Sequence, residues 1–577
     1  MYSNKENVNI LTALLVSHGI RHAVVCPGSR NAPIVHNLNE CPDIECHPVT
    51  DERSAGFYAV GMAQALDEPV VVCVTSGSAL LNLAPAVAEA YYQHLPVVVV
   101  SADRPQGWID QLDGQTLPQP DALGRFVSRA VTLPEPRNDE ERWYCNRLVN
   151  EALLETHGDE GSPVHINVPV SEPLFNFSAE ALPKERVITR FTPSIDYDCL
   201  HAALLDDFLS SQRPMVVFGQ TNPHHFAGET GDYLFSHVIT LHEARAPFPS
   251  VSHFDEVLYA TADNTTLLPP DFILYVGDCI VSKRLKRFLR QAHDAKVWRI
   301  SPSGQVEDTF MNLRGIVKGD PEFTLGSLSH KMKNWSWAKP MAYRRQWLQL
   351  LRQAATHANH YEPAYSQMAT VKYFEEKLEA LRAGKEALCP STEALCSGGE
   401  PLCPIVHYAN STAVRLANIY ARHHVWCNRG VNGIEGSLST AAGYSVVSNP
   451  AKVFCVIGDL SFFYDQNALW NLQLCGNLRI LLLNNGQGGI FNLLAGLEQS
   501  PARNTLVAAA HHTTAEGICQ QNDIYYQHAT NMEDMKKGID LLFEADFSRP
   551  VLIEVQTDVS EDERIYKDYY QSLVLEA

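Results

Sequence analysis

The chain has 577 residues, more than one hydrophobic core supports, which predicts three to four domains. Hydrophobic residues make up 45% and charged residues 19%, as in an ordinary globular protein, and no apolar run approaches the ~20 residues that span a bilayer. The formal net charge of −21 argues against nucleic acid and anionic membranes as partners. Any site for anionic substrates must reverse that field with local cations.

The cysteines and the beginning of the chain bear on the compartment. Fourteen cysteines lie mostly singly, often inside strand-like runs, which indicates reduced, buried thiols rather than a disulfide framework. The first ten residues, MYSNKENVNI, lack the basic and then apolar order of a secretory signal. We therefore expect a cytoplasmic protein that does not insert into a membrane.

Short β-branched runs alternate with helical stretches, a pattern typical of parallel α/β sheets. In region 1–185 the predicted strands are HAVVCPGSR, PVVVCVTSG, LPVVVVSADRP and SPVHINVPV, with a helix over ALLNLAPAVAEAYYQ. In region 186–345 they are PMVVFGQ, VITLHEA, DFILYVGD and KVWRIS. In region 346–577 they are HVWCNRG, KVFCVIGD, LRILLLNN and PVLIEVQ. The sequence thus predicts three doubly wound parallel-sheet domains with ligands at the carboxyl ends of the strands.

Two stretches are candidate domain boundaries, and a third is unusual. Residues 183–194 are typical of a linker, because prolines bracket a charged segment, and the tryptophan-rich residues 334–347 indicate a second boundary. Residues 386–404 form a seven-residue near-repeat around three cysteines: Cys389, Cys396 and Cys403. Six residues between cysteines is unlike zinc-ligand spacing, so a duplicated surface insertion is favoured over a metal site.

The strongest chemical signal lies in residues 456–491. One predicted strand ends at Gly458 and Asp459, a helix follows, and the next strand ends at Asn485. The 25 residues between Asp459 and Asn485 suffice for a crossover helix and a parallel return strand. A carboxylate and an amide oxygen then lie side by side, which suits Mg²⁺ bridged to a diphosphate. The alternative is that these residues merely end strands.

This segment resembles the metal motif of the thiamine-diphosphate enzyme superfamily, which begins Gly-Asp-Gly and ends in Asn-Asn. By that resemblance, Asp459 and Asn485 bind Mg²⁺ (or Mn²⁺) through their side chains and Gln487 binds it through its backbone carbonyl. The cofactor would lie against the residues that flank the aspartate: Gly458, Leu460 and Ser461. Leu460 stands where the wider motif has its third-position glycine.

The superfamily also implies a glutamate beside the aminopyrimidine ring, on a separate domain. Glu52, in PVTDERSAGFYAVGMAQA, follows a strand and opens a helix of small residues. A carboxylate there can hydrogen-bond a pyrimidine nitrogen and so promote loss of the thiazolium proton. The alternative is a glutamate that only complements a helix N-terminus. Because superfamily members build the site between two subunits, we expect a homodimer or homotetramer in which Glu52 faces the partner's Asp459.

A finer resemblance, over most of the chain, is to the 2-succinyl-5-enolpyruvyl-6-hydroxy-3-cyclohexene-1-carboxylate synthases of menaquinone biosynthesis. It rests on CPGSRNAP, TDERSAGF, TSGSALLNLAPAVAEA, SADRP, SKRL, NSTAVR, NRGVNGIEGSLSTAAG and GDLSFFYD, and the Gly-Asp-Leu-Ser form of the metal motif is typical of this branch. The resemblance implies a transferase that decarboxylates 2-oxoglutarate and joins the remaining unit to isochorismate. Both substrates are polycarboxylates, which accounts for the need for cations.

The same resemblance implies which residues surround the substrates. The predicted substrate-binding residues are Ser29, Arg30, Arg104 and Gln115 on the glutamate-bearing domain, Lys283 and Arg284 on the central domain, and Asn410, Ser411, Arg415 and Arg429 on the metal-bearing domain. Three apolar residues are expected to support the bent cofactor and wall its thiazolium side: Ile434, Ile490 and Phe491. Taken singly, each cation is more often a surface charge or an ion pair, whereas six within short motifs indicate carboxylate binding.

Three other functions compete with this one. Another 2-oxo-acid decarboxylase or carboligase, such as an acetolactate-synthase-like enzyme, has less need for several cations. A non-catalytic cofactor-binding protein does not require both Glu52 and the metal pair. A Rossmann dehydrogenase is disfavoured, because no G-x-G-x-x-G opens a helix after a predicted strand. The sequence leaves open whether the cysteine repeat just before NSTAVR is a disordered loop or a gate to the site.

Overall fold

The computed structural model describes residues 1–577 except 158–160, 191–201, 225, 227–230, 263–266, 334, 336–337, 384–403, 494–495, 545–546 and 576–577. The cysteine repeat and the end of the predicted linker therefore lie outside the described residues. Within the described ranges, no helix is long and apolar enough to cross a membrane.

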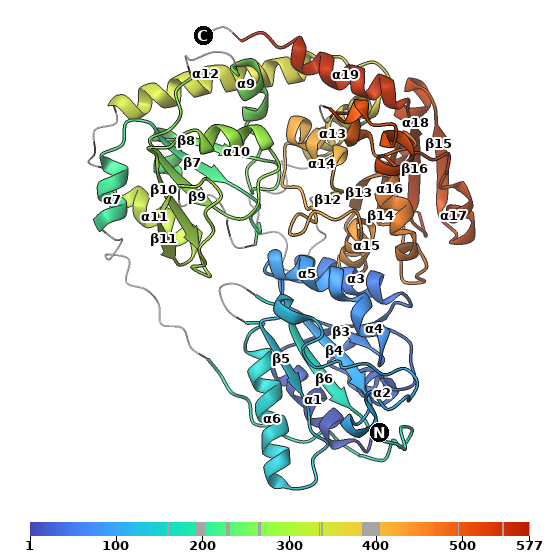
Figure 1. The fold of residues 1–577 in the computed structure, drawn as a ribbon. Coiled ribbons are helices and arrows are strands. Elements are labelled where there is room, and N and C mark those ends of the chain that lie inside the picture. Colours follow the sequence, from blue (N-terminus) through green and yellow to red (C-terminus); the bar gives the residue numbers. More distant parts are fainter. Residues whose placement is uncertain are drawn as a thin grey trace.

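Three sheets, each made of parallel strands, follow one another along the chain (Figure 1). The first contains, from edge to edge, β2 (Glu45–Pro48), β1 (His22–Val25), β3 (Val70–Val74), β4 (Val97–Asp103), β6 (Val164–Pro169) and β5 (Arg129–Thr132). The second contains β11 (Leu313–Lys318), β10 (Lys296–Ser301), β9 (Phe272–Val276), β7 (Pro214–Phe218) and β8 (Ile239–His242). The third contains β12 (Ile405–Tyr408), β13 (Val453–Gly458), β14 (Leu478–Asn484), β16 (Val551–Gln556) and β15 (Tyr525–Ala529).

Helices alternate with these strands, so the predicted α/β fold class with three parallel-sheet domains is confirmed. Around the first sheet lie α1 (Glu6–Ser17), α2 (Ala32–Glu40), α3 (Glu52–Leu66), α4 (Ser78–Asn82), α5 (Ala84–Tyr92) and α6 (Asp139–Leu153). Around the second lie α7 (Ala202–Leu209), α8 (Asp232–His237), α9 (Phe254–Ala260), α10 (Lys283–Arg290), α11 (Pro321–Lys331) and α12 (Ala338–His360). Around the third lie α13 (Gln367–Ala383), α14 (Thr412–Tyr420), α15 (Ser437–Val447), α16 (Asp459–Tyr464), α17 (Glu516–Gln521), α18 (Met532–Phe543) and α19 (Val559–Gln571). Short helical turns are η1 (Gln106–Trp108), η2 (Gly124–Phe126), η5 (Gln466–Leu469), η6 (Gly489–Leu493), η7 (Leu497–Gln499) and η8 (Arg503–Val507).

Two predicted elements differ from the structure for local reasons. The helix predicted over ALLNLAPAVAEAYYQ forms as two helices, α4 and α5, and Pro85 in the first turn of α5 accounts for the break because proline lacks a backbone N–H. HVWCNRG is not a strand, and this prediction was wrong. Trp426 makes only an isolated bridge with His407, and Val425 N donates instead to Ala244 O at 2.8 Å. The edge strand here is β12.

The first and third sheets pack together through α3 and α15. The backbones approach so closely that a Cβ added at Gly61 would lie 2.0 Å from Thr440 O, and one added at Gly443 would lie 2.3 Å from Tyr58 O. Buried residues of both helices belong to one apolar core that includes strands of the two sheets. The start of α3, where Glu52 lies, is therefore held firmly against the third sheet's layer of helices.

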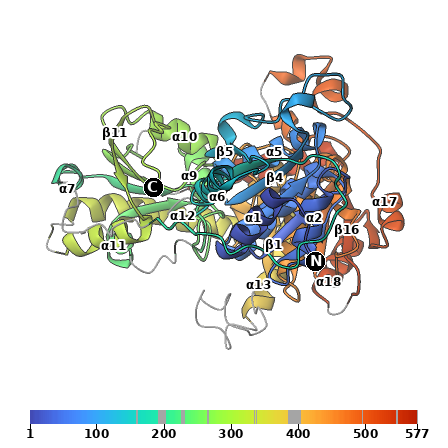
Figure 2. The same ribbon diagram turned by 90° about the horizontal axis from the view of Figure 1, so that it is seen from below.

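Helix α12 connects the second and third sheets along the top of Figure 1. Its Trp347 is fully buried in the core of the second sheet, whereas Ala358 belongs to the core of the third. Seen from below in Figure 2, the second sheet lies to one side of the other two. The predicted boundary at 345 falls inside α12, and both boundaries, at 185 and 345, stay predictions.

Candidate active site

Asp459 and Asn485 lie next to each other at the carboxyl edge of the third sheet. Strands β13 and β14 are parallel neighbours, and Asp459 follows β13 directly as the first residue of α16. One carboxylate oxygen, Oδ2, accepts hydrogen bonds from the backbone N–H groups of Asn485 and Gly486, at 3.1 and 2.9 Å. The other, Oδ1, accepts from Leu460 N at 2.7 Å. These bonds fix the carboxylate, which is 4% exposed, against the loop that follows β14.

The side-chain amide of Asn485 is oriented by a residue from the last helix. Its Nδ2 donates to Asp562 Oδ2 at 3.0 Å, so the amide oxygen is left as the ligand atom. Asp562 in turn accepts from Thr557 Oγ1 and Gln367 N, at 2.7 and 2.8 Å. Burial raises the pKa of the Asp562 carboxyl against the effect of these donors. Nothing in the sequence pattern pointed to Asp562, which lies 77 residues after Asn485.

The residues at this edge fit a divalent cation that carries a diphosphate. A carboxylate oxygen and an amide oxygen are hard ligands of the kind that Mg²⁺ prefers. A Cβ added at Gly458 would meet no atom within 4 Å, so the backbone before Asp459 borders open space that a ligand can enter. Gly486 has φ +76°, and a Cβ there would lie 2.9 Å from His511 O, so the turn leading to Gln487 requires glycine. Ser461 is buried on α16.

A cavity of about 430 Å³ between the second and third sheets has a strongly cationic lining. Its charged residues are Lys283, Arg284 and Arg287 from α10, Arg415 from α14, Lys567 from α19, and Asp255. Because five cations outnumber one carboxylate, the lining is positively charged, opposite in sign to the net charge of the chain. The structure thus brings together four residues that the sequence proposed for the site: Lys283, Arg284, Arg415 and Ile490.

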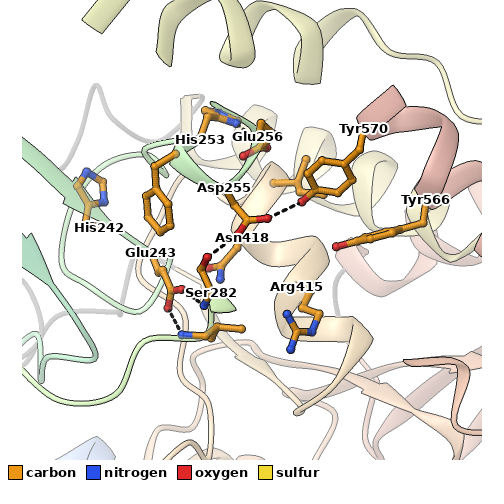
Figure 3. Close-up of a pocket in the computed structure, with 13 residues that line it drawn as sticks. His242, Glu243, His253, Asp255, Glu256, Ser282, Arg415, Asn418, Tyr566 and Tyr570 are labelled. Carbon is orange, nitrogen blue, oxygen red and sulfur yellow. Dashed lines mark hydrogen bonds and ion pairs between the residues drawn. The ribbon is translucent and has the colours of Figure 1, made fainter. Parts of the chain in front are cut away.

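Two of the three arginines of this cavity, Arg284 and Arg415, differ in their surroundings. Arg284 forms an ion pair with Asp255, and its guanidinium stacks on Tyr259 and Tyr570, 5.0 and 4.7 Å from the ring centroids. Asp255 also accepts a hydrogen bond from Tyr570 at 3.1 Å (Figure 3). By contrast, no carboxylate among the described residues forms an ion pair with Arg415, which Figure 3 shows beside Tyr566. The Arg415 guanidinium is therefore not neutralised by an ion pair among the described residues, whereas that of Arg284 is.

The cationic cavity adjoins the loop of Asn485. Ile490 lines the cavity and lies in η6, which begins four residues after Asn485. A smaller neighbouring pocket is lined by Asn485 and Tyr566, and Tyr566 also lines the cationic cavity. Phe491, half-buried, covers Gly488, where an added Cβ would lie 2.8 Å from its ring. A ligand held at Asn485 would therefore lie beside the cationic cavity.

Asn410 organises the loop that carries Arg429. Its Nδ2 donates to Asn428 O and Gly433 O at 2.6 and 2.7 Å, and its Oδ1 accepts from Arg429 Nη1 at 3.2 Å. The Nε of Arg429 is buried without a hydrogen-bond partner. Two further predicted residues border this loop: Ser411, which precedes α14 with φ 73°, and Ile434, which is 41% exposed.

The predicted residues of the first sheet lie elsewhere in this chain. Arg30 is buried, donates to Val170 O at 2.9 Å and pairs with Glu172 at 3.0 Å. Arg104 pairs with Asp113 at 3.0 Å. The two other residues are exposed Ser29, after β1, and Gln115, whose backbone carbonyl accepts from Ser76 Oγ. Of the described residues that line the cationic cavity, none comes from the first sheet.

Glu52 opens α3, and both of its neighbours are tied to the segment that follows Asp459. Asp51 caps the helix and accepts from Asn467 Nδ2 at 2.6 Å. Arg53 donates to Tyr464 O at 2.8 Å and stacks on the Tyr464 ring. Glu52 itself is half-buried, and its Oε2 accepts from Asn82 Nδ2 at 3.2 Å. The carboxylate is therefore positioned by its surroundings without an ion pair of its own among the described residues.

One further residue of this region, on α5, was not predicted from the sequence. Glu89, 2% exposed, accepts from Gly430 N and Val431 N, each at 2.7 Å, and so holds the loop of Arg429. Burial raises its pKa. The motif TSGSALLNLAPAVAEA contains Glu89, so a buried glutamate in an otherwise apolar helix was the signal that could have identified it.

Comparisons with known proteins show the family to which the chain belongs. Residues 6–123 match the family model described as the thiamine pyrophosphate enzyme N-terminal TPP binding domain. A relative from Bacteroides fragilis is 43% identical, over 99% of this chain and 100% of its own length. Relatives from Bacteroides thetaiotaomicron and Flavobacterium johnsoniae are 42% and 32% identical, over 99% and 96% of this chain and 100% and 96% of their own lengths. All three are named 2-succinyl-5-enolpyruvyl-6-hydroxy-3-cyclohexene-1-carboxylate synthase. This chain belongs to that family of thiamine-diphosphate-dependent enzymes.

Proposed function

We propose that the protein decarboxylates 2-oxoglutarate and adds the remaining four-carbon unit to isochorismate, in menaquinone biosynthesis, with thiamine diphosphate and Mg²⁺ as cofactors. The observation that carries this proposal is the cationic cavity beside the loop of Asn485, in which Arg415 forms no ion pair with a carboxylate among the described residues. Both substrates carry carboxylates, and a chain of net charge −21 gains such a cavity only by concentrating its cations there.

The cofactor-binding roles follow from the geometry of the third sheet. Asp459 and Asn485 are proposed to bind Mg²⁺ through side-chain oxygens and Gln487 through its carbonyl, with Asp562 orienting the amide of Asn485. Mn²⁺ is proposed as the alternative ion for the same ligands. Bound thiamine diphosphate supplies the electron sink that decarboxylation of a 2-oxo acid needs. The residues proposed to lie against it are Gly458, Leu460, Ser461, Ile434, Ile490 and Phe491.

Glu52 is proposed as the catalytic carboxylate. It would hold a proton at a pyrimidine nitrogen of the cofactor, and Asn82 would keep its second oxygen in place. Half-buried Ile490 and Phe491 would exclude water from the reacting carbon, since a proton reaching it would end the reaction at the aldehyde. The enzyme therefore needs both a fixed carboxylate and an apolar wall.

Substrate carboxylates are proposed to bind to cations on several elements. Arg415 is suited to a bidentate contact, because its planar guanidinium matches a carboxylate. The remaining substrate-binding residues are proposed to be Lys283, Arg284, Asn410, Ser411, Arg429, Ser29, Arg30, Arg104 and Gln115. The central domain would thus contribute two cations on α10.

We further propose a homo-oligomer, dimer or tetramer, with active sites between subunits. The first-sheet residues do not line the cationic cavity of their own chain, as is expected if they complete the cavity of another copy. We propose a cytoplasmic location because the ten described cysteines are free, which suits a reducing compartment.

The function is tested by following CO₂ release from 2-oxoglutarate with thiamine diphosphate and Mg²⁺, with and without isochorismate. We expect release that rises when isochorismate is added, together with an adduct of the expected mass. Consumption of pyruvate with inert 2-oxoglutarate would instead favour an acetolactate-synthase-like enzyme. No turnover of either acid would favour a cofactor-binding protein without catalysis.

Arg415→Met is expected to raise the KM for a carboxylate substrate about 10- to 100-fold, because a charge-assisted hydrogen bond is lost. The measurement is the initial rate of CO₂ release as a function of each substrate concentration. Arg125→Met, at an exposed position of the first domain, is the control and should leave both KM values unchanged. Unchanged KM values in Arg415→Met would remove Arg415 from the substrate site.

A further inference from the structure

A second group of potential metal ligands lies on the first sheet, apart from the cofactor site. Strand β2 is an edge strand and pairs in parallel with β1, so that His22 lies opposite Glu45. Because side chains alternate along a strand, Glu45 and His47 point to the same face of β2. Among the described residues, the ligand atoms of His22, Glu45 and His47 all lie within 4.8 Å of one another.

The two imidazoles converge at the separation that a shared metal ion requires. His22 Nδ1 and His47 Nε2 are 3.1 Å apart, and the rings stack with centroids 5.4 Å apart and 20° between their planes. Glu45 Oε2 lies 4.0 Å from His22 Nδ1. Two zinc–nitrogen bonds of about 2.0–2.1 Å at a tetrahedral angle place their nitrogens roughly 3.3–3.4 Å apart. Small side-chain movements therefore suffice to bind an ion.

An outer contact orients His47 as a ligand. Its Nδ1 lies 3.3 Å from Gln473 Oε1, and an amide oxygen only accepts, so Nδ1 carries the proton. The lone pair of His47 Nε2 then faces His22. A metal-binding histidine commonly donates its other N–H to an oxygen in this way. Gln473 lies between η5 and β14 in the third-sheet region, so this contact also links the first sheet to the third.

The charges at this position favour a cation. The carboxylates of Glu45 and Glu68 both contribute negative potential at His22. His47 is 1% exposed, while the Glu45 side chain is 66% exposed. The group thus contains a buried ligand, His47, and is open to solvent on the side of Glu45.

We propose that His22, Glu45 and His47 form a binding site for Zn²⁺ or a similar transition-metal dication, with water completing a tetrahedral shell. The ion fastens edge strand β2 to β1 and, through Gln473, steadies the contact with the third-sheet region. The competing arrangement is a metal-free pair in which His22 Nδ1–H donates to His47 Nε2. The two arrangements differ in whether the protein binds Zn²⁺ at this position.

The test uses the full-length protein, stripped with a chelator and then saturated with Mg²⁺ and thiamine diphosphate. Titration with Zn²⁺ by calorimetry should show one tight equivalent per chain and a rise in the unfolding temperature, and Co²⁺ should give the visible absorption of a tetrahedral site. The double variant H22A/H47A should lose all three signals. Glu45→Gln should weaken binding by at least about tenfold, as loss of even an outer-shell contact does.

His293→Ala, which changes an exposed histidine of the second domain, is the matched control and should bind Zn²⁺ like the wild type. Because removing buried His47 risks unfolding, His22→Gln at the half-exposed position provides a second variant, with its metal-free unfolding temperature measured first. The proposal is overturned if the wild type shows no saturable Zn²⁺ binding, or if a folded His22→Gln binds it with wild-type affinity and spectrum.

Discussion

Replacing Glu52 by glutamine is expected to lower the rate of CO₂ release from 2-oxoglutarate by about 10²- to 10⁴-fold, the usual contribution of a positioned acid–base group. Glutamine has the same shape and can still accept the hydrogen bond from Asn82 Nδ2 through its amide oxygen. It cannot take up and hold a proton at neutral pH. The measurement is the initial rate at saturating substrate, thiamine diphosphate and Mg²⁺.

The surroundings of Glu52 make this substitution a clean test. Helix α3 is capped by Asp51 and anchored to Tyr464 by Arg53, so neither contact depends on the Glu52 side chain. The unfolding temperature and the affinity for Mg²⁺ should therefore change little. A large loss of rate without a loss of stability separates a catalytic carboxylate from one that only complements the helix N-terminus.

Glu140→Gln is the matched control, because Glu140 is an exposed glutamate in the first turn of α6. It should retain the wild-type rate. If Glu52→Gln also retained it, with 2-oxoglutarate still decarboxylated, the catalytic role would pass to another group and Glu52 would be left with the structural role.

The sequence predicted the sheets best where strands are buried on both faces. Every residue of β3 and β4 is buried, and both strands begin with an unbroken apolar run, VVVCV in β3 and VVVV in β4, which is the pattern of a strand covered on both faces. Four strands at sheet edges were not predicted: β5, β11, β12 and β15. Burial is irregular in three of them, as in β5, where one of four residues is buried, so local pattern alone does not distinguish these three from loops.

The candidate site was predictable where two residues follow neighbouring parallel strands, because the sheet then brings them together. One crossover between adjacent parallel strands is enough to place Asn485 beside Asp459. Arg284 and Arg415, however, look alike in the sequence, and only the packing of α9 against α10 gives Arg284 its partner Asp255. Asp562 reaches Asn485 from α19, a contact between distant segments that local patterns do not encode.

Asp459→Asn is expected to weaken Mg²⁺-dependent binding of thiamine diphosphate by more than about 100-fold, since loss of even an outer-shell contact lowers metal affinity about 10- to 100-fold. The substitution removes the negative charge that the cation needs. Both oxygens of the Asp459 carboxylate accept hydrogen bonds from backbone N–H groups, those of Leu460, Asn485 and Gly486. In asparagine one of these oxygens is replaced by N–H₂, which cannot accept such a bond. Calorimetric titration with thiamine diphosphate at fixed Mg²⁺, and with Mg²⁺ at fixed thiamine diphosphate, measures the effect.

Asp465→Asn is the control for Asp459→Asn. It makes the same chemical change at a nearby buried aspartate that is not a proposed metal ligand, so it shows whether the change alone disturbs the local structure. Asp465 follows α16, is fully buried, and accepts from the N and Oγ of Ser439, each at 2.7 Å. Burial raises its pKa to about 6, so a neutral amide of the same shape resembles a form the native protein already adopts near that pH. This variant should bind thiamine diphosphate with wild-type affinity. If Asp459→Asn did so as well, with an unchanged requirement for Mg²⁺, the cation would have to be bound by other residues, and the proposed pairing of Asp459 with Asn485 as metal ligands would be wrong.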